Sequence, residues 1–209
     1  MNEAYKYAAG DVIAFGASGV FSDTIKLVTQ SPVSHVAIVK QVLENGDAVL
    51  MESTTLYKGR RGVQENLVSE RQAEHSGRMW WLPLSKQART YLNYDKLTEF
   101  LQKQVGKGYD IRQCIGLPLA HVPLLGRYVA PEDWRQVFCS ELVGGAFEAA
   151  GILQESYNCA GLSPRDICRL RLYANCVQMK GPDKKIRYNT VQVFFPEWEL
   201  GEVGLSPSK

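Results

Sequence analysis

The segment "SPVSHVAIVKQVLENGDAVLMEST", residues 31–54, constrains the fold more than any other part of the chain. It contains two runs rich in β-branched and apolar residues. Between them, "ENGD" carries an Asn-Gly pair, which is typical of a tight turn between antiparallel strands. The segment therefore predicts a β-hairpin whose first strand begins near His35 and whose second strand contains Glu52. Every second residue of the first run can then face a core.

Other segments predict further strands and helices around this hairpin. Apolar spacing, glycine stops and proline positions separate the helical segments from the extended ones. The predicted strands are "GDVIAFG" (10–16), "RMWWLPLS" (78–85) and "RYNTVQVFFP" (187–196). The predicted helices are "SDTIKLVTQ" (22–30), "YDKLTEFLQKQVGKG" (94–108), "FCSELVGGAFEAAG" (138–151) and "SPRDICRL" (163–170).

Length and composition are typical of one globular domain. The 209 residues are 45% hydrophobic and 22% charged, so we expect a single domain over residues 1–209, with a frayed tail from about residue 200. The formal charge of +2 is too small to predict a nucleic-acid partner. The first residues lack the pattern of a secretion signal, and no apolar segment is long enough to span a bilayer, so a cytoplasmic protein is expected.

Cys139 is the strongest candidate nucleophile. A cysteine at a helix start lies beside free amides and the positive end of the helix dipole, which favour the reactive thiolate. The same amides can receive the negative oxygen that develops during acyl transfer. A small buried hydrophobe is the alternative reading of Cys139, and of the remaining cysteines. The five cysteines are an odd number, with no pair at metal-type spacing, so neither a disulfide framework nor a metal is expected: Cys114, Cys139, Cys159, Cys168 and Cys176.

Three histidines are available as the general base. His75, in "AEHSG", is interpreted as a solvated loop residue, and His121, in "LAHVP", is the second candidate. His35 begins a predicted strand, where its side chain can be held rigidly at the sheet edge. A histidine satisfied within a core remains the alternative for His35.

Glu52 is the candidate for orienting His35, but the simplest hairpin places it too far from His35 along the strand. If Asn45 and Gly46 form a two-residue turn, Val39 faces Glu52 and His35 faces Leu56. His35 and Glu52 then share one face but are separated by roughly 13 Å along the strand, at about 3.3 Å per residue. Thr54 is nearer in this register. A strong twist, a bulge or a different turn is needed to bring Glu52 close.

Several motifs together resemble a known family. "GDVIAF", "SPVSHVAIV", "LMEST", "GYD" and "FCSELV", within residues 10–153, are similar to the circularly permuted branch of NlpC-type papain-like hydrolases, the YiiX-like group, in which the histidine strand precedes the cysteine helix. The resemblance implies an α+β papain-like fold, with an antiparallel sheet packed against helices and the cysteine at a helix N-terminus. It further implies Cys139 as nucleophile, His35 as general base and then acid, and Glu52 as the orienting residue.

The function implied by this resemblance is a cysteine hydrolase that cleaves an amide bond in a peptide or a cell-wall peptide through a thioester. Without a secretion signal, a cell-wall substrate would require phage lysis or virion delivery. A lipid acyl hydrolase or acyltransferase would use the same two residues, and a non-catalytic peptide- or acyl-binding module would keep only the fold. None of these readings requires a cofactor.

Overall fold

A six-stranded antiparallel sheet forms the centre of the molecule. The computed structural model describes residues 5–17, 20–108, 138–154 and 158–193. Hydrogen bonding orders the strands as β4-β3-β2-β1-β5-β6. Their bounds are β1 Val12–Gly16, β2 His35–Val42, β3 Ala48–Tyr57, β4 Arg60–Leu67, β5 Arg78–Leu82 and β6 Val177–Lys180.

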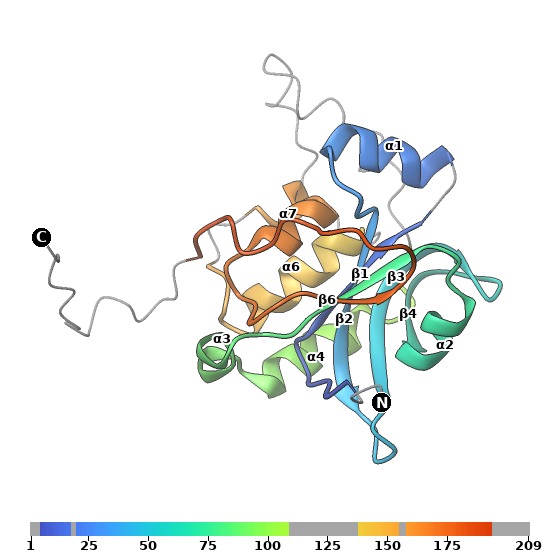
Figure 1. Cartoon of the computed structure of the whole chain (residues 1–209). Coiled ribbons are helices and arrows are strands. Elements are labelled where there is room, and N and C mark those ends of the chain that lie inside the picture. Colours follow the sequence, from blue (N-terminus) through green and yellow to red (C-terminus); the bar gives the residue numbers. More distant parts are fainter. Residues whose placement is uncertain (1–4, 18–19, 109–137, 155–157, 194–209) are drawn as a thin grey trace, which may run out of the picture.

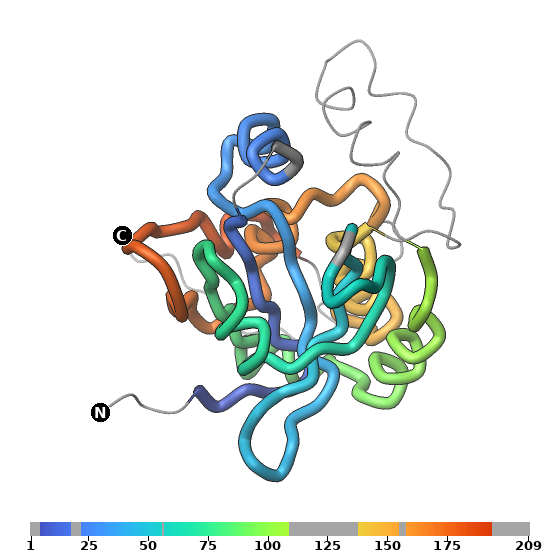
Figure 2. The backbone as a smooth tube through the Cα atoms, turned by 90° about the vertical axis from the view of Figure 1, so that its right-hand side faces the viewer, coloured from blue at the N-terminus to red at the C-terminus, as the bar shows by residue number. Residues whose placement is uncertain are grey.

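Helices cover both faces of the sheet unequally (Figure 1). Their bounds are α1 Val20–Thr29, α2 Val68–Glu74, α3 Lys86–Tyr91, α4 Tyr94–Gln104, α6 Cys139–Ala149 and α7 Pro164–Arg169, with a 3₁₀ turn η1 at Cys159–Gly161. Helices α4, α6 and α7 pack on the face that carries Val36 and Ile38. Helix α2 begins over the opposite face, where Val68 packs with Ala37 and Val39. Helix α1 projects from one end of the molecule in both views (Figures 1 and 2).

This architecture confirms the coarse prediction of an α+β fold with an antiparallel sheet packed against helices. The predicted late strand is wrong over residues 187–193, where the structure has only an isolated bridge between Leu170 and Val191. Asn189 has a φ of 53°, a left-handed conformation that interrupts extended pairing. The sixth strand, β6, is formed by residues that precede the predicted strand in the sequence. The predicted tail from about residue 200 lies outside the described residues.

The β2–β3 hairpin forms as predicted, but its register is different. Leu43 N donates to Asp47 O over 2.8 Å and Gly46 N donates to Leu43 O over 2.9 Å, so the loop contains three residues rather than two. A bulge between Val39 and Gln41 shifts the register by one further residue. The two shifts preserve which face each side chain occupies, because the side-chain period of a strand is two.

The shifted register moves Glu52 towards His35. Ile38 pairs with Met51 and Val39 pairs with Leu50, and continuing this pairing places Ala37 opposite Glu52. Glu52 is then a diagonal neighbour of His35, about 7 Å along the strand at about 3.3 Å per residue. Two long polar side chains span that separation. The prediction that Val39 faces Glu52 is therefore wrong, and the error arises from the loop length and the bulge.

Gly46 is required by the three-residue loop, because its φ of 85° is a conformation that side-chain-bearing residues rarely adopt. We expect Gly46→Ala to lower the free energy of unfolding by about 1 kcal/mol, measured from the urea midpoint. A Cβ atom at Gly46 meets no atom within 4 Å, so the loss reports backbone strain alone. Gly161→Ala is the matched control, since Gly161 does not have a positive φ and its added Cβ would lie an ordinary 3.5 Å from Asn158. Equal losses in both variants would contradict the prediction.

Candidate active site

Cys139 is the first residue of α6 and belongs to the helix layer. Phe138, immediately before it, is extended, and its N–H donates to Glu141 Oε2 over 3.1 Å, which fixes the start of the helix. Leu142, Val143 and the residues one turn later bury the helix against the sheet. Cys139 is a free thiol with only 1% of its surface exposed. The first amides of a helix have no partners within it, so they lie beside this sulfur as hydrogen-bond donors.

His35 is the first residue of β2, and its ring joins Cys139 to Glu52. The Nε2 atom of His35 lies 2.8 Å from Glu52 Oε2. The Cys139 sulfur also neighbours the His35 ring, closely enough to raise the pKa of His35 through its negative charge and through hydrogen bonding. Because Nε2 is engaged by Glu52, Nδ1 is the ring nitrogen that remains for the cysteine. The His35 side chain is 17% exposed, so one edge of the site is accessible to solvent.

Glu52 is completely buried, and its carboxylate is held by two further side chains. Asn66 Nδ2 donates to Oε1 over 2.8 Å. Arg71 contributes an ion pair, with Nε 2.8 Å from Oε1 and Nη2 3.3 Å from Oε2. A buried carboxylate is stable only when it is paired and hydrogen-bonded, and these donors meet that requirement.

The electrostatics of the site favour a protonated His35 beside an ionised Glu52. Burial lowers the pKa of His35, but the negative charge of the Cys139 sulfur, the hydrogen bond to it and the contact with Glu52 outweigh burial and raise that pKa to about 9. For Glu52, burial acts to raise the pKa, whereas His35, Arg71 and Asn66 together hold it below its ordinary value. His35 is therefore an imidazolium at neutral pH when Cys139 is a thiolate.

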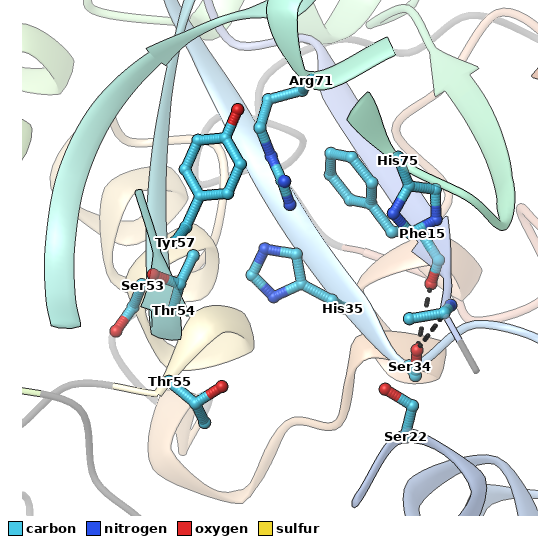
Figure 3. A pocket seen from close by; sticks show the side chains of 11 residues that line it. Phe15, Ser22, Ser34, His35, Ser53, Thr54, Thr55, Tyr57, Arg71 and His75 are labelled. Atoms are coloured by element: carbon cyan, nitrogen blue, oxygen red, sulfur yellow. Dashed lines mark hydrogen bonds between the residues drawn. The ribbon is translucent and has the colours of Figure 1, made fainter. Parts of the chain in front are cut away.

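A pocket of about 190 Å³ opens beside His35 (Figure 3). Hydroxyl groups dominate its polar lining: Ser22, Ser34, Ser53, Thr54, Thr55 and Tyr57. Arg71 and His75 complete the polar wall, and Phe15 is its aromatic part. Among the described residues, the lining contains no carboxylate.

His75 differs from its predicted role as a solvated loop residue. It follows the last residue of α2, is half-buried and lines the pocket, with its ring at the edge of the Phe15 ring and 5.2 Å between centroids. Burial and the positive charges of Arg71 and His35 lower the pKa of His75 to about 4. His75 is therefore neutral where His35 is charged.

The other residues considered in the sequence analysis make contacts different from those of Cys139, His35 and Glu52. Thr54, the nearer partner for His35 in the simple register, accepts a hydrogen bond from Gln64. Cys159 donates to Glu148 over 3.1 Å, and burial raises the pKa of both Cys168 and Cys176. Two residues considered in the sequence analysis, Cys114 and His121, lie outside the described residues.

Asn66 and Arg71 are site residues that the sequence analysis did not identify. They lie on β4 and α2, in a stretch for which no element was predicted. Tyr57 and Arg60 pair across Lys58 and Gly59, both with positive φ, and this two-residue turn is the signal that locates β4. Alternate side chains of a strand share one face of the sheet, so Asn66 and Gln64 of β4 lie on the same face.

The described residues include neither a metal-binding cluster nor a membrane-spanning helix. Within the described part of the chain, no three His, Cys, Asp or Glu side chains are grouped so that they could hold a metal ion. Across the same residues, no helix has the length and apolar character needed to cross a membrane.

Comparisons with known proteins show a solved structure of similar fold. No protein-family model matches the chain, and no curated protein matches it. The crystal structure of the metalloprotein YiiX from Escherichia coli O157:H7 is similar, with a TM-score of 0.53 and 16% sequence identity. The alignment covers 85% of this chain and 99% of that chain. The protein therefore has a YiiX-like fold.

Proposed function

We propose that this protein is a cysteine hydrolase of the permuted NlpC-type papain-like kind, with Cys139 as nucleophile, His35 as general base and acid, and Glu52 as the orienting residue. The observation that carries this proposal is the position of the His35 ring, whose Nε2 lies 2.8 Å from Glu52 Oε2 and whose pKa is raised by the neighbouring Cys139 sulfur. A nucleophile, a base and an orienting acceptor in that order form the arrangement that activates a thiol.

The proposed reaction has two stages. The Cys139 thiolate attacks the carbonyl carbon of an amide, and the imidazolium of His35 transfers its proton to the leaving amine as the C–N bond breaks. Neutral His35 then takes a proton from water, which attacks the thioester and releases the acid. Amides at the start of α6, that of Cys139 first, are the proposed donors to the oxyanion in both stages.

The substrate class proposed is a peptide or a cell-wall-type peptide. The pocket beside His35 supports a polar substrate, because hydroxyl groups make up most of its polar lining. An ester of a lipid would react by the same steps, so peptide amides and acyl esters should be assayed side by side.

Alkylation by iodoacetamide tests the proposal without knowledge of the substrate. We expect Cys139 to react near pH 7 at least about tenfold faster than Cys159, Cys168 and Cys176, because among these described cysteines it is the one whose thiolate an imidazolium would stabilise. His35→Ala should remove this difference. The rate is measured by mass spectrometry of peptides after timed labelling.

Cys168 is the internal control in the same protein, since burial raises the pKa of its thiol. If Cys139 reacts no faster than Cys168, or if His35→Ala leaves its rate unchanged, the pair is not activated. The fold would then serve binding rather than hydrolysis.

A further inference from the structure

Arg71 makes its contacts within the candidate active site and not at the solvent-exposed surface. It lies on α2, its side chain is 11% exposed, and it meets both oxygens of the fully buried Glu52. The hydrogen bond from Nη2 and the ion-pair contact of Nε hold both oxygens of the carboxylate against the guanidinium group. Rotation of Glu52 away from His35 would break the ion pair.

Two aromatic rings hold the guanidinium group in place. Its central carbon lies 4.1 Å from the centroid of the Tyr57 ring and 5.0 Å from that of the Phe15 ring. Figure 3 shows the group beside the His35 ring, between Tyr57 and Phe15. Such cation–π contacts are stronger where water is excluded. Arg71 is therefore pre-organised before any substrate binds.

The helix that carries Arg71 is itself anchored. Lys180 of β6 donates to the carbonyl oxygens of Gln72 and Ala73 at the end of α2. Gln72 Nε2 donates to Met179 O over 3.2 Å. The end of α2 is thus fixed to β6, which keeps Arg71 over Glu52.

We propose that Arg71 is a positioning residue that acts through Glu52, and that it sets the pH above which the Cys139–His35 pair carries the thiolate. This inference rests on the proposed function. Arg71 holds Glu52 towards His35 and balances the charge of the carboxylate, so that this charge does not oppose loss of the proton from the sulfur.

Other charged and titratable groups surround this arrangement. They are Cys139 from α6, Tyr57 and Glu52 from β3, Glu74 from α2, His75 directly after α2, and Lys180 from β6. Glu74 accepts a hydrogen bond from Tyr57 and carries the opposite charge to Arg71. His75 is neutral at neutral pH, which leaves Arg71 as the cation that contacts Glu52 besides His35.

Removal of the guanidinium should shift the pH at which the thiolate forms in one definite direction. Without it, the negative charge of Glu52 is no longer balanced by Arg71. An unbalanced negative charge favours protonation of neighbouring groups, the Cys139 sulfur included. The thiolate–imidazolium pair should therefore form at a higher pH.

The experiment is the pH dependence of Cys139 alkylation in the full chain. We expect Arg71→Met to raise the acid midpoint of the alkylation rate by about one pH unit, the lower end of the effect of a charge at this range. Arg71→Lys, which retains the charge, should restore most of that shift. Arg89→Met is the matched control, because Arg89 pairs with another fully buried carboxylate, that of Asp11, and should leave the midpoint unchanged.

Each outcome decides the inference. An Arg71→Met midpoint equal to wild type, with wild-type alkylation still dependent on His35, overturns the role of Arg71 alone. An equal shift in Arg89→Met, or no restoration in Arg71→Lys, also overturns it. If wild-type alkylation does not depend on His35, the proposed function fails and the inference fails with it. Should Arg71→Met not fold, the Arg71→Lys and Arg71→Gln midpoints must still differ in the same direction.

Discussion

Cys139→Ala is expected to abolish hydrolysis, with at least about a thousandfold loss of kcat, because the proposed thioester forms on the Cys139 sulfur. The fold should remain, since the change removes a single sulfur atom from a helix that is otherwise buried by Leu142, Val143, Ala146 and Phe147. Activity is measured on peptide amides and acyl esters. Folding is followed by circular dichroism and thermal melting.

Cys168→Ala is the matched control for this prediction. Cys168 is as buried as Cys139, at 1% exposure, and lies on the short helix α7. Its replacement costs similar packing but leaves the site intact, so kcat should stay at the wild-type value. Retained turnover in Cys139→Ala would remove the nucleophile from the proposed mechanism.

The sequence predicted the members of the candidate site better than their geometry. His35 and Glu52 were placed on one face of a hairpin, and that parity is confirmed because two single-residue shifts restore it. Their separation was wrong, since neither the bulge near Lys40 nor the three-residue loop has a strong sequence signal. Asn-Gly is compatible with two-residue and longer loops, and only the hydrogen bonds distinguish them.

Tertiary contacts explain what the sequence could not predict. Arg71 is an ordinary charged residue in "NLVSERQAEH", and its ion pair with Glu52 depends on how α2 crosses the sheet. His75 was read as solvated because its neighbours in sequence are polar. Its half-buried position results from the Phe15 ring on β1, sixty residues away in the sequence. By contrast, Cys139 at a helix start was predictable, because the apolar spacing after it is local.

Glu52→Gln is the second change with a large expected effect. The carboxylate of Glu52 accepts hydrogen bonds from His35 and Asn66 and an ion pair from Arg71. A glutamine has one acceptor oxygen and one amino group, so its amino group must face a donor, and Arg71 keeps a buried charge without a counterion. We expect the free energy of unfolding at pH 7 to fall by about 3 kcal/mol, as for one partner removed from a buried pair.

The loss of stability should depend on pH with a definite sign. The folded-state pKa of Glu52 is held below its ordinary value of 4.5, so stabilisation by the ionised carboxylate is complete above that pH and disappears as pH falls through the folded-state value. The difference between wild type and Glu52→Gln should therefore shrink in acid. Urea unfolding at several pH values measures it.

Activity should change at the other end of the pH range. In wild type, turnover should decline as pH rises through about 9, where His35 loses the proton that the leaving amine requires. Without the negative charge of Glu52, the pKa of His35 falls, so this decline should begin at least about one pH unit lower, and kcat/KM near pH 7 should fall about 100-fold. Glu65→Gln on β4 is the matched control, because Glu65 is 42% exposed and pairs with Lys40. If Glu52→Gln and Glu65→Gln gave the same pH–rate profile, Glu52 would not orient His35, and the hydrogen bond between them would be structural.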